Sequence, residues 1–97
     1  MTVYIKNSDK PDKKYKVIFP DGKEIHFGAR GYTDYIISGA KERKNRYLAR
    51  HKPNQNWTKS GIHTAGFWSR WILWNKTTLE KSIKNVEKRF NIKVKFL

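Results

Sequence analysis

The chain has 97 residues, with 22 lysines and arginines against 8 aspartates and glutamates, and no cysteine. This length predicts one domain with a modest core, and the absence of cysteine excludes disulfides and thiolate metal sites. A net charge of +14 destabilises a compact chain, because the like charges repel one another. A polyanionic partner is the usual reason that such a charge is tolerated. The alternative is that the positive charge only keeps the protein soluble. No apolar run is long enough for a signal peptide or a membrane span, so we expect a soluble protein that is not secreted.

The N-terminal residues 1–14 join a short alternating run to a charged stretch of turn-forming residues. We expect a flexible segment or an edge strand here, and a single basic α+β domain over residues 15–97. Its clearest element is a hairpin, because β-branched and aromatic residues at about 15–19 and 23–27 flank a Pro-Asp-Gly turn.

Helical patterns follow the hairpin, after a loop with one short helical turn. Threonines before the second and third helix are suited to cap their first turns. The C-terminal residues 92–97 alternate like a strand and are expected to join the hairpin as a third antiparallel strand. The predicted fold is therefore a small antiparallel sheet packed on three helices, of about 41–51, 65–74 and 79–90.

The densest apolar stretch is residues 65–74, which holds three of the four tryptophans. On a helix, Phe67, Trp71 and Trp74 fall on one line, which indicates a core helix. The alternative is that one or two rings stay exposed as a platform for bases or a partner. Trp68 lies off the central line and is the ring expected to be partly exposed.

Positive charge is concentrated between Lys41 and Lys59, where seven cations face Glu42 alone. Lysines and arginines on a helix are suited to contact phosphates, and an aromatic ring near them can lie against a sugar or base. Arg70, the one charge in the tryptophan stretch, either pairs with a carboxylate such as Glu42 or Asp34 or contacts the same polyanion. The predicted nucleic-acid-binding residues are Lys41, Arg43, Lys44, Arg46, Arg50, His51, Lys52, Trp57, Lys59 and Arg70.

Several short motifs together have a familiar pattern. They are Phe19-Pro20-Asp21-Gly22, Phe27-Gly28-Ala29, Gly31-Tyr32-Thr33-Asp34-Tyr35, Arg43-Lys44, Tyr47-Leu48-Ala49-Arg50-His51, Trp57-Thr58-Lys59-Ser60-Gly61-Ile62 and Thr64-Ala65-Gly66-Phe67-Trp68-Ser69-Arg70-Trp71. From about Tyr15 to Phe90 the chain resembles a family of small basic proteins encoded by large eukaryotic DNA viruses, such as the mimivirus and marseillevirus groups. That family is a domain of unknown function. The resemblance implies a viral setting and a virion component, and it supplies no catalytic residue.

Enzymatic chemistry has little support in the sequence. The three histidines have no carboxylates at metal-ligand spacing, so we expect no metal and no cofactor. The best enzymatic alternative is a small nuclease that uses Tyr32 or Tyr35 with Arg50, His51 and Glu80.

The sequence thus predicts a non-enzymatic DNA-binding protein with little sequence specificity, because the contacts that can be named are charge contacts. Double-stranded DNA is the expected partner, although DNA or RNA and duplex or single strand stay open, as does the oligomeric state. We expect no membrane partner. The resemblance implies a role in genome packaging, in the virion, the host cytoplasm or the nucleus, and other virion proteins are candidate partners. A scaffold protein that binds acidic virion proteins is the alternative from another class.

Overall fold

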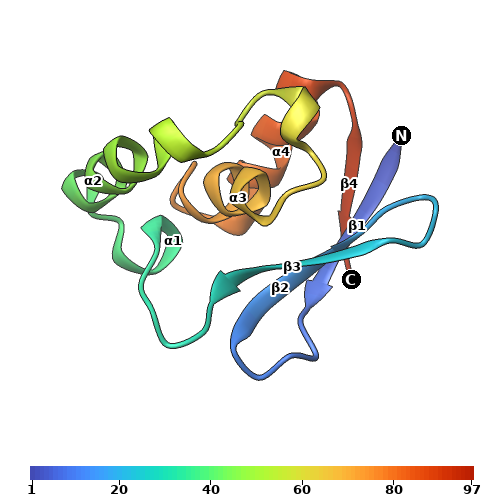
Figure 1. Cartoon of the computed structure of the whole chain (residues 1–97), viewed down its shortest axis with the longest axis horizontal. Coiled ribbons are helices and arrows are strands. Elements are labelled where there is room, and N and C mark those ends of the chain that lie inside the picture. The colour runs from blue at the N-terminus through green and yellow to red at the C-terminus, as the bar shows by residue number, and fades with distance from the viewer.

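A four-stranded sheet lies on one side of the molecule, and the helices cover one of its faces (Figure 1). The computed structural model describes residues 1–97. The α+β class that the sequence predicts is confirmed. The strands are β1 Thr2–Asn7, β2 Lys13–Ile18, β3 Glu24–Ala29 and β4 Lys93–Phe96.

The strand order is β3-β2-β1-β4, which places β1 inside the sheet. The predicted hairpin is confirmed as β2 and β3, with Tyr15 opposite Phe27. The expectation of a flexible segment or edge strand at residues 1–14 is wrong for β1, which pairs antiparallel with β2 and parallel with β4. The expected antiparallel placement of the C-terminal strand is also wrong. Alternation identifies a buried strand face, but it carries no information about the neighbours of the strand or their direction.

The outer edge of β4 is partly blocked by a side chain. The Val94 N–H, which points away from β1, donates a hydrogen bond of 3.0 Å to Glu87 Oε2. An open strand edge invites pairing with another chain, and a charged side chain across it opposes that. Edge-to-edge association through β4 is therefore discouraged.

The helices begin and end close to their predicted bounds, and those of 41–51 and 79–90 are confirmed. The first turns of the second and third predicted helices are capped by the predicted threonines, since Thr64 accepts from Phe67 N–H and Thr78 from Lys81 N–H. The helices are α1 Tyr35–Ser38, α2 Lys41–His51, α3 Ala65–Trp68 and α4 Leu79–Phe90. Short 3₁₀ turns lie at Lys52–Asn54 and Lys59–Gly61. No helix is both long enough and apolar enough to cross a bilayer.

The tryptophan stretch differs from a regular α-helix. After α3 the chain continues as a π-helical turn, Ser69–Leu73, and the Trp74 N–H donates to the Ser69 carbonyl at 3.1 Å. Such a turn bonds i to i+5 and rotates the following side chains relative to an α-helix. Trp74 therefore leaves the predicted line and stacks on Tyr47 of α2, with ring centroids 4.4 Å apart and planes at 6°.

The core lies between the sheet and the helices, and Trp68 is at its centre. The expectation that Trp68 is partly exposed is wrong: its exposed fraction is 0%, and its Nε1–H donates to the Ile62 carbonyl at 2.7 Å. Phe67 is also fully buried. The core interpretation of the tryptophan stretch is thus the one that the structure supports.

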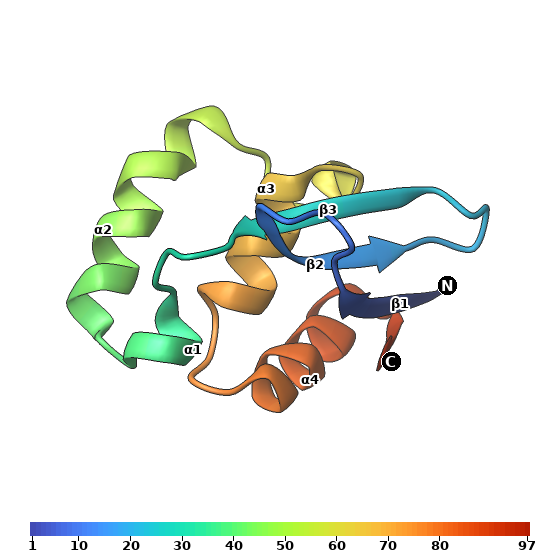
Figure 2. The ribbon, with the colours of Figure 1, turned by 90° about the horizontal axis from the view of Figure 1, so that it is seen from below.

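Helix α2 stands apart from the sheet, with α3 between them (Figure 2). Tyr47 is the one buried residue of α2, and it is held in a row of rings that includes Trp74 and Trp57. This single anchor leaves the rest of the helix out of the core. An open space consequently borders α2 on the side that faces β3.

Candidate nucleic-acid interface

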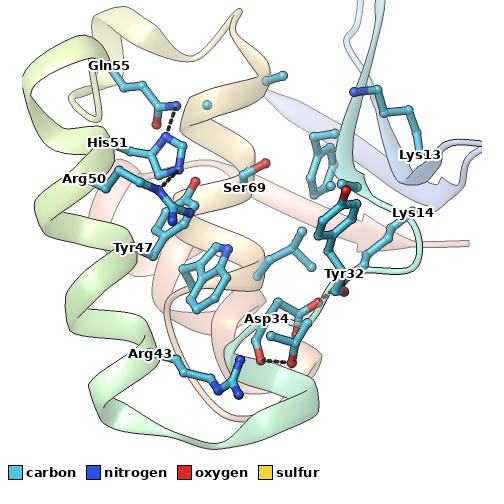
Figure 3. A pocket seen from close by; sticks show the side chains of 18 of the residues that line it. Lys13, Lys14, Tyr32, Asp34, Arg43, Tyr47, Arg50, His51, Gln55 and Ser69 are labelled. Carbon is cyan, nitrogen blue, oxygen red and sulfur yellow. Dashed lines mark hydrogen bonds and ion pairs between the residues drawn. The ribbon is translucent and has the colours of Figure 1, made fainter.

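A cleft of about 500 Å³ opens between α2 and the sheet. Helix α2 forms one wall, and β2, β3 and the loop with Tyr32 and Asp34 form the other (Figure 3). The tryptophan stretch lies between the two walls. One carboxylate, Asp34, lines the cleft. The cations that line it are Lys13, Lys14, Arg43, Arg46 and Arg50.

The arginines reach the cleft because of their spacing on α2. Arg43, Arg46 and Arg50 lie at i, i+3 and i+7, which places them on one stripe of a helix. All three side chains are exposed, and none takes part in an ion pair. Three guanidinium groups without a carboxylate partner thus lie along the lip of one cleft.

The opposite wall is held by a buried ion pair. Lys14 Nζ lies 2.6 Å from Asp34 Oδ2 and donates to the Tyr32 carbonyl at 2.6 Å. The other carboxylate oxygen of Asp34 accepts from the Ile37 N–H and caps α1. Asp34 therefore fixes the loop, and Lys14 neutralises the only carboxylate in the cleft.

Two glycines of the cleft let neighbouring side chains pack closely against the backbone. At Gly28, where φ is +81°, a Cβ would lie 2.7 Å from Leu73 Cδ1. At Gly66 a Cβ would lie 2.7 Å from the Gln55 side chain. Both positions therefore require a residue without a side chain, for steric reasons and at Gly28 also for backbone conformation.

His51 lines the cleft at the end of α2. Its ring lies 4.3 Å from the ring of Tyr47, its Nε2 accepts from Arg50 Nε at 3.3 Å, and its Nδ1 lies 3.3 Å from the Gln55 amide nitrogen. Burial, and then the charge of Arg50, lowers the pKa of His51 below its ordinary value of 6.5. The imidazole is therefore neutral at pH 7.

Four of the predicted site residues lie in this cleft, namely Arg43, Arg46, Arg50 and His51. Lys13 and Lys14 were missed, because residues 1–14 were predicted to be a flexible segment or an edge strand outside the basic domain. The signal that could have found them is strand register: Lys13 pairs with Ala29, at the end of β3 where the chain turns towards α2. Among the other predicted residues, Lys41, Lys52 and Lys59 are exposed and lie outside the cleft.

Lys44 lies on a different side of α2. Its Nζ donates to the Asn75 carbonyl at 2.7 Å and lies 4.9 Å from the centre of the Tyr35 ring. Burial, followed by repulsion from Arg70, Lys76 and Lys41, lowers the pKa of Lys44. This lysine ties α2 to the end of the tryptophan stretch.

Arg70 has no carboxylate partner, so the expected pairing with Glu42 or Asp34 is wrong. Its guanidinium lies 4.2 Å from the Trp71 ring and 5.5 Å from the Trp57 ring, and its Nη1 donates to the Trp74 carbonyl at 2.8 Å. The guanidinium of Arg89 also lies over Trp71, at 4.5 Å.

Burial is the main cause of a lowered pKa for Arg70, and Arg89 adds to it. Arg70 and Lys44, together with Trp57 and Trp71, form what we call the arginine–tryptophan stack.

Trp57 is part of that stack and is half-buried. Its Nε1–H donates to Gln55 Oε1 at 2.8 Å, and its carbonyl accepts from Trp71 Nε1 at 2.9 Å. Since it does not line the cleft, the structure does not bring Trp57 together with the cleft arginines.

The residues of the nuclease alternative do not converge. Tyr32, Arg50 and His51 line the cleft, whereas Glu80 lies on α4, exposed, with its carboxylate 3.1 Å from Lys84. Tyr35 lies under Lys44 on the other side of α2. No group of three or more histidine, aspartate or glutamate side chains is arranged to hold a metal ion.

The fold and the site define a small basic α+β domain with a cationic cleft along one helix. Residues 3–51, about half of the chain, match a family described as a family of unknown function, DUF5754, and the chain belongs to this family. All five cleft cations and Asp34 lie within the matched region. The match includes β1 and ends with α2, whereas the resemblance in the sequence runs from about Tyr15 to Phe90. No curated protein and no solved structure matches the chain.

Proposed function

We propose that the protein binds nucleic acid through the cleft, without catalysis and with little sequence specificity. The observation that carries this proposal is the charge of the cleft. Five cations line it, and its one carboxylate is already paired with Lys14. A concave surface lined by one sign of charge focuses its field and raises the local concentration of the opposite charge. A polymer of phosphates matches such a surface best.

The arginines favour phosphate over an isolated carboxylate. Arg43, Arg46 and Arg50 form a row, and over seven residues an α-helix rises by about 10 Å. A row of this length meets successive phosphates of one chain, each of which accepts two parallel hydrogen bonds from a guanidinium. Little sequence specificity is expected, because phosphate contacts carry no sequence information directly.

The test is the salt dependence of binding, measured by fluorescence anisotropy with labelled oligonucleotides for the wild type and for Arg46→Ala/Arg50→Ala. Counterion release predicts a steep fall in affinity between about 50 and 200 mM salt. The double variant should bind more weakly, with a slope smaller by about 0.7 to 0.9 for each lost phosphate contact. The matched control is Lys81→Ala/Lys88→Ala, which removes two exposed cations from α4. Equal losses in both variants would contradict the assignment of the cleft, and no binding at low salt would contradict the function.

The resemblance to proteins of large eukaryotic DNA viruses supports a finer proposal for the setting. In such a virus the protein would neutralise genome phosphates during packaging, or act where the genome is replicated. Mass spectrometry of purified virions tests this, and consistent absence of the protein from them would contradict packaging. Capture of acidic virion proteins by a nuclease-treated sample would instead favour the scaffold alternative.

A further inference from the structure

We infer that the cleft binds a single strand, with an unpaired base between the Tyr32 wall and the Tyr47–Trp74 stack and with phosphates along the α2 arginines. This inference rests on the proposed function and narrows its ligand to unpaired nucleic acid. It replaces the duplex that the sequence favoured.

Size is the first argument. The cleft holds about 500 Å³, within the range of pockets that enclose small molecules. In a duplex the bases are stacked inside and the backbones lie outside, so a duplex can only rest on the lip of such a cleft. A single strand can place one nucleotide inside it.

Aromatic side chains line both walls of the cleft. Tyr32 is 73% exposed, and its ring is paired with no other aromatic ring, although its carbonyl is fixed by Lys14. Figure 3 shows Tyr32 on the wall opposite Tyr47. Trp74, stacked on Tyr47 and half-buried, also lines the cleft. Bases of any sequence stack on such rings, which is how proteins hold single strands without sequence readout.

The distribution of charge around α2 argues against insertion of this helix into a duplex groove. A groove-reading helix presents its contacts on the face that points away from its own domain. On α2 that face carries Glu42, Asn45 and Ala49, and Lys41 at its beginning is the one cation of the helix that shares it. The arginine stripe borders the cleft instead. The charges are therefore placed for a strand that lies in the cleft.

The experiment compares a labelled oligothymidine, an oligouridine of the same length and a duplex of the same length, each titrated with the full chain at one low salt concentration. We expect the single strands to bind about tenfold more tightly than the duplex, in line with one or more stacked bases. The two single-stranded arms separate DNA from RNA as the source of the strand.

Tyr32 provides the discriminating variant. Tyr32→Ala should weaken single-strand binding about tenfold and leave duplex binding unchanged, whereas Tyr32→Phe should keep the wild-type affinity, because the ring and not the hydroxyl stacks. The matched control is Tyr4→Ala, since Tyr4 is an exposed tyrosine of β1 that does not line the cleft. Circular dichroism shows that each variant is folded.

Duplex binding as tight as single-strand binding, or an equal effect of Tyr32→Ala on both ligands, would overturn the inference while the proposed function stands. Binding of none of the three ligands would overturn the proposed function itself.

Discussion

The cleft and the arginine–tryptophan stack lie on two sides of α2, and both are rich in cations. In the cleft, Arg43, Arg46 and Arg50 are exposed and form no ion pair, beside an open volume of about 500 Å³. In the stack, Arg70 and Lys44 donate to backbone carbonyls and lie over aromatic rings. The same residue types are therefore exposed without ion pairs in one place and hold helices together in the other.

Burial explains why the two regions differ. A guanidinium loses hydration when it is buried, and it is stable there only if rings and carbonyls replace the water. Arg70 has such partners at its Nη1 and over the faces of Trp57 and Trp71, so its charge is engaged within the fold even though its Nε is buried without a hydrogen-bond partner. The cleft arginines keep their hydration until an anion displaces it. Substitutions should consequently separate the two regions, by stability in one and by binding in the other.

The largest expected effect is at the ion pair that holds the wall of the cleft. Asp34→Ala leaves Lys14 buried without its partner and removes the cap of α1, so we expect a loss of about 3–5 kcal/mol in the free energy of unfolding. Urea denaturation measures it. The control is Asp12→Ala, because Asp12 is exposed and forms no ion pair, and its effect should stay within about 0.5 kcal/mol. Equal effects would show that Asp34 does not hold the wall.

The next effect is in the stack. Arg70→Ala removes the donor to the Trp74 carbonyl and the cation between two rings, and we expect a loss of about 1–3 kcal/mol in stability. The affinity of the folded variant for oligonucleotide should change less than twofold. A large loss of affinity at unchanged stability would assign Arg70 to the binding surface and remove the distinction between the two regions.

A single cleft arginine should show the opposite behaviour. Arg43→Ala should change the free energy of unfolding by no more than about 0.5 kcal/mol, while the slope of log affinity against log salt falls by about 1. Thermal unfolding and anisotropy on the same sample give both values. A shift in stability without a change in slope would mean that Arg43 is a structural residue.

The smallest effect concerns pH and His51. Its pKa is lowered, so between that value and 6.5 the unfolded chain binds more protons than the folded one, and stability falls as the pH falls through this window. The affinity for oligonucleotide should rise roughly severalfold as the pH falls through the same window, because nearby phosphates favour the charged imidazole.

Two variants test whether His51 causes this dependence of affinity on pH. His51→Asn should abolish the rise in affinity, whereas His63→Asn should not, since His63 is exposed and lies outside the cleft. A rise that persists in His51→Asn would contradict the role given to this histidine.

Local structure was predicted well from local pattern. The bounds of α4 follow from its apolar spacing and its threonine cap, and the hairpin follows from its turn residues, whereas α2 begins without a side-chain cap. The positions of elements relative to one another were not predicted. Nothing in the alternation of β1 shows that it lies between two strands, and nothing in the spacing of Trp68 shows that a π-helical turn follows it and changes which rings face outward.

The candidate site was predicted in part for the same reason. The arginines of α2 lie on one helix, so their spacing alone places Arg43, Arg46 and Arg50 together. Lys13 comes from another element, and only the pairing of β2 with β3 brings it to the cleft. Conversely, Lys44 and Arg70 were predicted as binding residues from their charge alone. A sequence shows the charge of a side chain but not its packing against aromatic rings.

NMR distinguishes binding of nucleic acid in the cleft from binding at the arginine–tryptophan stack. The amide and side-chain signals of the labelled full chain are followed as a short oligothymidine is added. The largest shifts are predicted for the residues of the cleft, including Lys13, Tyr32, Arg46 and Arg50, with little change at Arg70 and Arg89. Binding in the cleft would be contradicted if the largest shifts occurred at Lys44, Arg70 and Arg89 while the cleft signals did not move.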